Sequence, residues 1–427
     1  MKNPWWWIPT LYFAEGIPYF IVNNISVLMM TRLGVPNETM ALYTSLLYLP
    51  WVIKPFWSPF VDIFKTKRWW IVVMEAVMTV AFVGLTLSIP SVASDTIAAK
   101  STSVSLFTAT LVLFWLTAFA SATHDIAADG FYMLALDRKQ QTFFVGIRST
   151  FYRLSSIFGQ GVLVMVAGLL EERTGNIPGA WRTTILLTAV LFALITLYHT
   201  FMAPRPESDR PRGARGKDIV RDFVAAFATF FKKPNLAAAL SFMLLYRFAE
   251  ALMLKLVGPF FLDSNQAGGL GLSTATVGFV NGTVGVAALV VGGILGGMAA
   301  SRWSLRKCLW PMAAALILPC FVYVWMSAAL PSNLWAISAC VAVEQFGYGF
   351  GFQAYMLYLM RFSEGEFKTS HYAICTGFMA LSMMIPGLFA GYIWKWVGGY
   401  NPFFWLVMAC GLVTFAVTLL VRRTVVE

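Results

Sequence analysis

Long apolar runs follow one another almost without interruption from Trp5 to Val421. A helix that crosses the hydrocarbon core of a bilayer needs about 20 mainly apolar residues, and most of these runs reach that length. Apolar residues make up 59% of the 427-residue chain, charged residues make up 12%, and the mean hydropathy is +0.70. An ordinary soluble domain carries roughly twice this share of charge. The sequence therefore excludes a water-soluble globule and predicts that lipid surrounds most of the chain.

The runs predict an all-α integral membrane protein with twelve transmembrane helices. A transmembrane β-barrel is excluded because its strands are segments of about ten residues that alternate in polarity, and these runs do not alternate. The first run has little positive charge and no small-residue cleavage site, so we interpret it as an uncleaved span. The expected spans are residues 7–30, 39–61, 69–90, 104–134, 142–170, 181–202, 236–262, 273–300, 308–330, 333–360, 370–394 and 402–421.

The basic residues predict the orientation of these spans. If both termini are cytoplasmic, 21 of the 31 lysines and arginines fall on the inner side, 5 on the outer side and 5 within spans. Membrane proteins concentrate lysine and arginine in their cytoplasmic loops. We therefore expect a multi-pass protein of the bacterial inner membrane with both termini in the cytoplasm.

One long polar connection, residues 204–234, carries eight basic residues and divides the spans six and six. It predicts an N-terminal six-helix bundle at 1–203, a cytoplasmic basic linker at 204–234 and a C-terminal six-helix bundle at 235–427. Basic segments next to a membrane attract anionic lipid, so we interpret the linker as resting on lipid and expect no nucleic-acid partner.

The chain carries no pattern typical of an enzyme or a metal protein. It lacks a nucleophile motif, an HExxH-type ligand cluster and a phosphate-binding loop. The five cysteines lie in or beside apolar runs with no CxxC spacing, so we interpret them as small buried apolar side chains. We expect no catalytic activity, no cofactor and no metal.

Charged residues inside the spans carry the functional signal. An ionised side chain at the bilayer centre costs at least about 2.5 kcal/mol on insertion scales, so each must face a partner, a cavity or the substrate path. One group lies toward the cytoplasmic side, and two carboxylates with three cations there predict an ion-pair lock that closes an inner gate. A static structural network is the alternative, and proton transfer by Asp125 through His124 is a third interpretation. The group consists of Lys54, Asp125, Asp129, Arg148 and Arg153.

A second group lies nearer the midplane and comprises Glu15, Arg247, Glu250 and Glu344. Arg247 and Glu250 are three residues apart and are expected to pair on one helix face. Glu15 and Glu344 have no close partner in sequence, which favours proton coupling or substrate contact over simple hydrogen bonding between helices. Neighbouring tyrosines either stack on a sugar ring or serve in packing.

The two halves show a weak internal repeat. Ser58 aligns with Gly297, Asp62 with Ser301, and the pair Lys67–Arg68 with Arg306–Lys307. The pattern resembles, in imperfect form, the loop signature of the major facilitator superfamily. The resemblance implies two related six-helix bundles that rock against each other to give alternating access.

Six segments resemble, in order and spacing, the AmpG-type muropeptide permeases, in the peptide, acetyl-CoA and drug transporter branch of that superfamily. They are PWVIKPFWSPFVDIF, SATHDIAADGF, FYRLSSIFGQG, LLYRFAEAL, LSTATVGFVNGTVG and VEQFGYGFGFQAYMLYLM, and the resemblance extends from about Phe13 to Tyr392. It implies proton-driven import of anhydro-muropeptides across the bacterial inner membrane. The positions that match the family's motifs are Lys54, Trp57, Pro59, Asp62, Asp125, Asp129, Arg153, Tyr246, Arg247 and Glu344.

Three positions depart from the family's pattern. His124 stands in place of a glutamine, Glu15 in place of a small polar residue, and Glu250 in place of an aspartate. The added negative charge of Glu15 admits a neutral disaccharide or another amphiphilic solute as an alternative cargo. The wider alternative is an importer of a disaccharide, an acetyl-CoA-like solute or a drug on the same fold. A non-transporting membrane receptor is a further alternative, although no output module is appended.

Charge placement and resemblance together give two sets of candidate residues. The predicted substrate and proton path consists of Tyr12, Glu15, Tyr246, Arg247, Glu250, Glu344 and Gln345, and the predicted cytoplasmic gate consists of Lys54, Asp62, His124, Asp125, Asp129, Arg148 and Arg153. The expected partners are a small-molecule solute, protons and membrane lipids, and the expected state is a monomer.

Overall fold

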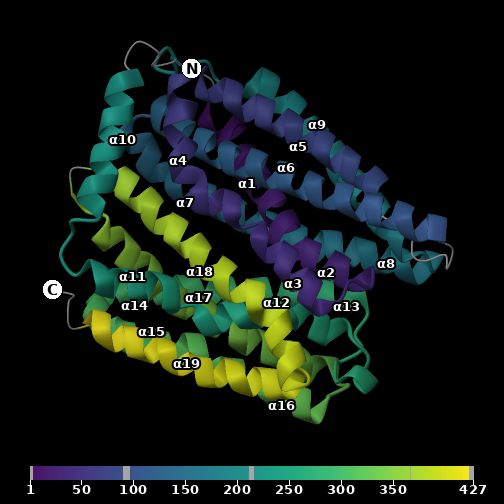
Figure 1. Ribbon diagram of the computed structural model, residues 1–427. Coiled ribbons are helices and arrows are strands. Elements are labelled where there is room, and N and C mark those ends of the chain that lie inside the picture. The colour runs from purple at the N-terminus through teal and green to yellow at the C-terminus, as the bar shows by residue number, and fades with distance from the viewer. Residues whose placement is uncertain (1–2, 90–96, 211–215, 366, 423–427) are drawn as a thin grey trace. The chain divides into compact units, whose positions relative to one another are not determined.

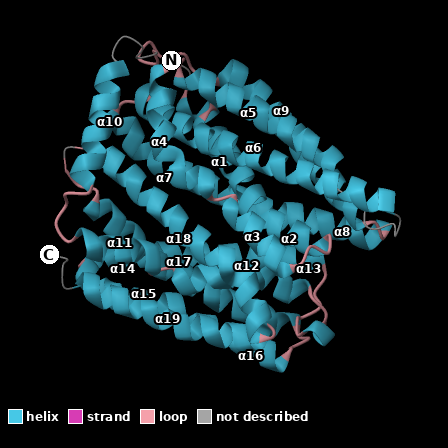
Figure 2. Ribbon diagram, viewed as in Figure 1, coloured by secondary structure: helices cyan, strands magenta, loops and turns pink. Residues whose placement is uncertain are grey.

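The computed structural model describes residues 3–89, 97–210, 216–365 and 367–422, and all of their regular structure is helical (Figures 1 and 2). For residues 62, 97–105, 138, 142, 145, 216–220 and 369 it describes the backbone only. The expected all-helical membrane fold is confirmed. Ten helical segments are long and apolar enough to cross a bilayer: Pro4–Arg32, Lys67–Ser88, Leu106–Ala135, Lys139–Thr174, Ile177–Met202, Leu236–Leu262, Thr274–Arg302, Leu305–Ala329, Ser370–Val397 and Tyr400–Arg422.

The other two expected spans also fall on helices. The span at 333–360 is α17 (Leu334–Phe362), a single helix of 29 residues. The span at 39–61 is divided into α3 (Asn37–Leu46) and α4 (Leu49–Ile63). Pro50 accounts for the division because proline has no N–H to continue a helix but is well placed in a first turn.

Contacts within the chain group it into two compact units, which we call unit 1 and unit 2. Unit 1 contains Met1–Leu33 and Phe56–Arg221, and unit 2 contains Gly34–Pro55 and Asp222–Glu427. The first half of the second span therefore groups with the C-terminal helices. The domain boundaries expected from the sequence, with all of the first 203 residues in one bundle, stay a prediction.

In unit 1, α5 packs against both α6 and α9, and α1 packs against α7 (Figure 1). A buried core near the start of α1 joins Trp7 and Tyr12 to Phe131 and Phe144. The helices are α1 (Ile8–Phe20), α2 (Ser26–Arg32), α5 (Lys67–Ser88), α6 (Ile97–Ala135), α7 (Arg138–Ser156), α8 (Val164–Thr174) and α9 (Ile177–Met202), with a short 3-10 turn η1 (Pro4–Trp6) before them. α4 and α10 (Gly216–Phe230) each contain one boundary between the units.

In unit 2, α17 packs against α14 and α15, while α18 packs against α3 and α12. The segment before α4 is joined to this unit by polar contacts. Asn37 donates to the Tyr400 hydroxyl at 3.1 Å, and Lys395 pairs with Glu38 at 2.6 Å. The helices are α3, α11 (Leu236–Leu245), α12 (Phe248–Leu262), η5 (Asn265–Ala267), α13 (Thr274–Val277), α14 (Val286–Arg302), α15 (Leu305–Ile317), η7 (Leu318–Cys320), α16 (Phe321–Ala329), α17, α18 (Lys368–Val397) and α19 (Tyr400–Arg422).

Besides the second span, divided at Pro50, and the ninth, which contains η7, four further spans are not continuous α-helices in the described structure. π-helical segments occur in the first, fifth and eighth spans as η2 (Ile21–Ile25), η3 (Ile157–Leu163) and η6 (Gly278–Gly285). The seventh span breaks between α11 and α12 at Tyr246 and Arg247. π-helical segments and broken helices frequently mark functional sites in membrane proteins. The side chains beside these positions are therefore candidates for the transport site.

The two ends of the basic linker are anchored by hydrogen bonds. At its start, the Asp209 carboxylate accepts from the backbone N–H groups of Lys67 at 2.7 Å and Arg68 at 3.0 Å, and so caps the first turn of α5. At its end, the Lys233 ammonium donates to the carbonyls of Phe362 at 2.6 Å and Glu364 at 2.7 Å. A carboxylate at a helix N-terminus and a cation on carbonyls near a helix C-terminus both complement the helix dipole.

Glycine allows close packing of α14 against α17. A Cβ atom at Gly292 would overlap the backbone carbonyl of Phe346, whereas a Cβ at Gly297, one turn and a half further along α14, would meet nothing within 4 Å. The first glycine of the segment GGILGG, residues 292–297, thus lies in close contact with α17.

We expect Gly292→Ala to destabilise the protein by about 1–3 kcal/mol, since the methyl group forces α14 and α17 apart. Gly297→Ala is the matched control and should leave stability unchanged or raise it by up to about 1 kcal/mol, because alanine favours a helix over glycine. Thermal unfolding of the full-length protein in one detergent measures both. Equal midpoints for the two variants would contradict the packing argument.

Candidate transport site

A polar cluster in unit 1 joins side chains from α1, α6 and α7. Tyr12 donates from its hydroxyl to Oδ1 of Asp129 at 3.2 Å, and Arg148 pairs with the same oxygen at 2.8 Å. Glu15, one turn after Tyr12, lies in the electrostatic field of Asp125, Asp129 and Arg148. We call these five residues the Glu15 cluster.

The cluster has one buried end and one exposed end. Glu15 is 9% exposed and its Oε2 has no hydrogen-bond partner, whereas the side chain of Asp129 is 43% exposed and that of Arg148 is 29% exposed. The Arg148 guanidinium also lies over the Tyr12 ring at 4.5 Å. The cluster thus places three carboxyl groups around the Arg148 cation, and repulsion between carboxylates disfavours ionisation of all three at once.

This arrangement combines residues that the sequence analysis had assigned to different groups. Glu15 and Tyr12 were expected on the midplane path, and Asp125, Asp129 and Arg148 in the gate. The structure places all five together because α1 packs against both α6 and α7. Asp125 and Asp129 share one face of α6, as their spacing of four residues predicts.

The other predicted gate residues lie elsewhere. His124 is 1% exposed and contacts Glu75 of α5, not the Glu15 cluster. Lys54 lies on the part of α4 that belongs to unit 2, and Arg153 is half-buried near the end of α7. The side chain of Asp62 lies outside the described part of the structure. The gate as a whole stays a prediction.

In unit 2, Arg247 occupies the break between α11 and α12. Its Nε and Nη2 donate to the two carboxylate oxygens of Glu250 at 2.8 and 2.7 Å, and Nη2 also donates to the Tyr348 hydroxyl at 2.9 Å. The guanidinium lies 4.9 Å from the centre of the Phe352 ring. The pairing of Arg247 with Glu250 expected from their spacing is confirmed, in a bidentate geometry that fixes both side chains.

Glu344 lies on α17 and is 2% exposed. Its Oε2 accepts from the Tyr323 hydroxyl at 3.2 Å and from the amide of the adjacent Gln345 at 2.9 Å. Neither partner is a cation. Glu344 is therefore a buried carboxyl group held by neutral donors.

The tyrosines divide between packing and polar contact. Tyr246 is fully buried, stacks on Tyr355 with ring centres 5.6 Å apart, and donates to the Gly351 carbonyl at 3.1 Å. Its ring therefore serves in packing in this conformation. Tyr12 and Tyr348, in contrast, bind charged side chains of the two clusters.

The sequence analysis gave no role to three buried ionisable residues. Glu75 and His199 lie within the third and sixth expected spans, are 0% and 1% exposed, and contact each other. Lys255 was recognised as an intramembrane cation but given no role; it is 3% exposed, and its Nζ donates to the Thr44 hydroxyl at 3.2 Å and lies 5.1 Å from the Tyr48 ring centre. Applying the cost of intramembrane charge to every span would have found Glu75 and Lys255. Among the described residues, no group of three or more histidine, cysteine or acidic side chains is placed to hold a metal ion.

Comparisons with known proteins agree with this architecture. A family model described as Major Facilitator Superfamily matches residues 10–366. The chain is 24% identical over 419 residues to the anhydromuropeptide permease of Escherichia coli, covering 97% of this chain and 79% of the relative. It is 23% identical over 405 residues to a putative transporter, AmpG 4, of Rickettsia felis, covering 92% and 90%.

Solved structures show the same fold at low sequence identity. The nucleoside transporter NupG matches with a TM-score of 0.71 at 12% identity over 99% of each chain. A D-xylose-proton symporter matches with a TM-score of 0.71 at 12% identity, over 96% of this chain and 95% of its own.

The helical fold, the buried charges within its spans and these relatives define a multi-pass membrane transporter, not an enzyme. The chain belongs to the major facilitator superfamily. Within it, the relationship to AmpG-type permeases that the sequence motifs indicated is confirmed.

We expect Glu250→Gln to destabilise the protein by about 3–5 kcal/mol, because it leaves the Arg247 charge buried without a counter-ion. Replacing both residues by methionine should recover most of this loss, since a well-packed apolar pair avoids the desolvation cost. Thermal unfolding of both variants in detergent is the measurement. A double variant that is no more stable than Glu250→Gln would show that the pair does not act as a buried ion pair.

Proposed function

We propose that this protein is a proton-coupled importer of anhydro-muropeptides, or of related sugar-containing wall fragments, across the bacterial inner membrane. Both termini face the cytoplasm in this proposal, and transport proceeds by alternating access. The similarity to the anhydromuropeptide permease of Escherichia coli over 97% of the chain is the observation that carries it. The positions that match the family's motifs extend this support to individual residues.

Buried carboxyl groups support proton coupling. Glu15 lies in the electrostatic field of Asp125 and Asp129, and repulsion between such close carboxylates favours binding of a proton. Glu344, held by Tyr323 and Gln345, has no cation to keep it ionised. A carboxyl group that is protonated when buried and ionised when exposed to water takes up a proton on one side of the membrane and releases it on the other.

Arg247 supports recognition of an acidic group on the cargo. Glu250 and Tyr348 use its Nε and Nη2 donors, while the two N–H groups on Nη1 have no acceptor among the described residues. A lactyl or peptide carboxylate accepts such donors with planar geometry. The ring of Phe352 beside the guanidinium adds an apolar face for the cargo.

The proposal predicts accumulation of radiolabelled N-acetylglucosaminyl-anhydro-N-acetylmuramic acid in proteoliposomes under an inward proton gradient. Glu344→Gln and Asp125→Asn should each reduce accumulation at least about tenfold, since general proton-transfer roles are worth that much or more. Glu171→Gln is the control, because Glu171 is a buried carboxylate already paired with Arg32 at 2.9 Å. Equal accumulation with the gradient abolished would remove the coupling claim.

The cargo itself is tested by competition and by a charge-specific variant. Unlabelled disaccharides, nucleosides and acetyl-CoA should compete poorly with the muropeptide, and strong competition by a neutral disaccharide would favour the alternative cargo. Arg247→Lys keeps the charge near Glu250 but removes the planar fork. It should weaken the acidic muropeptide at least about tenfold more than its neutral lactyl-alcohol analogue, and parallel losses for the two would refute the anchoring role.

A further inference from the structure

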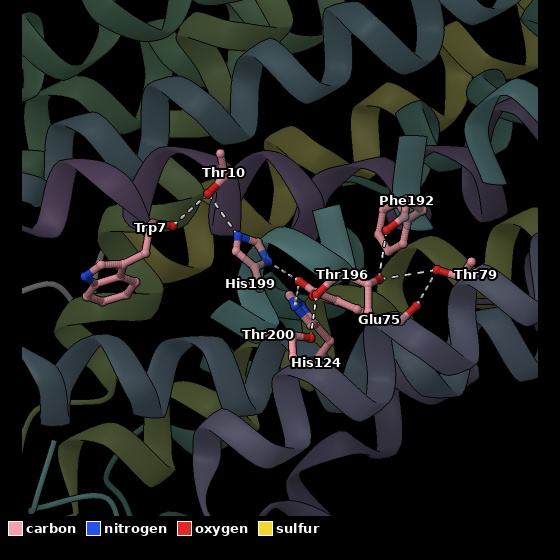
Figure 3. A network of polar contacts seen from close by, with 9 residues as sticks. All are labelled: Trp7, Thr10, Glu75, Thr79, His124, Phe192, Thr196, His199 and Thr200. Carbon is pink, nitrogen blue, oxygen red and sulfur yellow. Dashed lines mark hydrogen bonds and ion pairs between the residues drawn. The ribbon is translucent and has the colours of Figure 1, made fainter. Parts of the chain in front are cut away.

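A second polar cluster lies inside unit 1, away from the residues assigned above to substrate or gate. Glu75 of α5 receives both histidines of this unit on its Oε1: His199 of α9 through Nδ1 at 2.7 Å and His124 of α6 through Nε2 at 3.2 Å (Figure 3). His199 reaches Thr10 of α1 through Nε2 at 2.9 Å. All three ionisable side chains are at most 1% exposed.

The hydrogen bonds determine where protons lie. The Thr10 hydroxyl has one hydrogen for two neighbours, the Trp7 carbonyl at 3.2 Å and Nε2 of His199 at 2.9 Å. When this hydrogen is donated to Nε2, the imidazole hydrogen of His199 lies on Nδ1 and is donated to Glu75 at 2.7 Å. In this arrangement His199 is neutral, and the pair carries the single negative charge of the Glu75 carboxylate.

Two further atoms in the cluster are proton acceptors without partners. Nε2 of His124 contacts the Glu75 oxygen and acts as the donor, which leaves the lone pair of Nδ1 free. Nδ1 of His124 and Oε2 of Glu75 are both buried and have no hydrogen-bond partner. Buried polar atoms are almost always paired, so two orphaned acceptors within one cluster mark basic atoms to which an added proton can bind.

We propose that the Glu75–His124–His199 cluster is a proton-binding site within unit 1, which takes up one proton from water on lowering the pH and releases it to water on the opposite side during transport. The proton binds at Nδ1 of His124 and converts its imidazole to imidazolium, while the Glu75 carboxylate balances the new charge. The role in transport rests on the proposed function, whereas proton binding does not.

The ionisable groups that act on Glu75 are the two histidines of the cluster. The helices packed around Glu75 are α6 and α9, and their ionisable groups that act on it are His124 and His199. From α1 the facing residue is the neutral Thr10, and the next ionisable residues of that helix, Tyr12 and Glu15, belong to the Glu15 cluster. Thr79 and Thr196 line the remaining side and satisfy helix carbonyls (Figure 3).

The site shares two helices with the Glu15 cluster. His124 and Asp125 are consecutive on α6, and Thr10 and Glu15 are little more than one turn apart on α1. Because α6 carries a member of each cluster, a proton bound at His124 changes the field at Asp125. Loading of one site therefore alters the affinity of the other, which is the reciprocal coupling that a transport cycle needs.

The first test follows the protons directly. The sequence contains three histidines, so ¹⁵N-histidine labelling of the full-length protein in lipid bilayers gives three imidazoles to resolve by NMR. Lowering the pH from about 8 to about 5 should convert His124 from the neutral to the doubly protonated form. Glu75→Gln should abolish that conversion, while His371 of unit 2 and the Glu171→Gln variant serve as unaffected controls. A His124 that stays neutral over this range, or converts equally in Glu75→Gln, overturns the proposal.

The second test separates coupling from transport itself. In proteoliposomes, Glu75→Gln and His124→Gln should lose gradient-driven accumulation of the labelled anhydro-disaccharide at least about tenfold, yet retain equilibrium counterflow, which needs no net proton movement. Equal loss of both activities would mean a structural role and would overturn the coupling role. If the wild-type protein moves the probe in neither assay, the muropeptide proposal fails, and the NMR result alone decides whether the cluster binds a proton.

Discussion

The cost of an ionised side chain in hydrocarbon is the constraint on which the structure depends. Three of the buried groups meet that cost in different ways: Arg247 forms a bidentate ion pair with Glu250, Glu15 lies in a cluster of carboxyl groups around Arg148, and Glu344 accepts from neutral donors. The first arrangement is stable without a proton, whereas in the second, repulsion between carboxylates favours binding one. The buried groups of this transporter thus differ in whether they are suited to hold a structure or to exchange protons.

Irregular helices bring these groups into position. In the seventh span, α11 ends and α12 begins at Tyr246 and Arg247. This break places the Arg247 guanidinium beside Glu250, Tyr348 and Phe352. In unit 1 the π-helical segment η2 follows the helix that carries Tyr12 and Glu15 and packs against η3. Such interruptions weaken regular backbone hydrogen bonding, and neighbouring helices compensate for this in a membrane. They also provide places where a helix can bend.

Much of the fold and part of the site could be predicted from the sequence. The all-helical membrane architecture follows from the length and continuity of the apolar runs, and the pairing of Arg247 with Glu250 from a spacing of three residues. The grouping of candidate residues by depth did not predict which of them are in contact. The depth of a residue in the membrane does not determine which neighbouring helix its side chain faces. Glu15 was separated from Asp125 for this reason, and His124 was assigned to the gate although it faces Glu75.

The sequence by itself determined that the chain lies in a membrane, that its spans are helices, and which charges are too costly to lie there without a partner. These properties are local, since they depend on the transfer free energy of each residue and on the periodicity of one helix. Only the tertiary structure decided which charges meet, because partners such as Glu75 and His199 are 124 residues apart and are brought together by the packing of α5 against α9. The orphaned acceptors beside them are likewise a product of packing, which no spacing in the chain encodes.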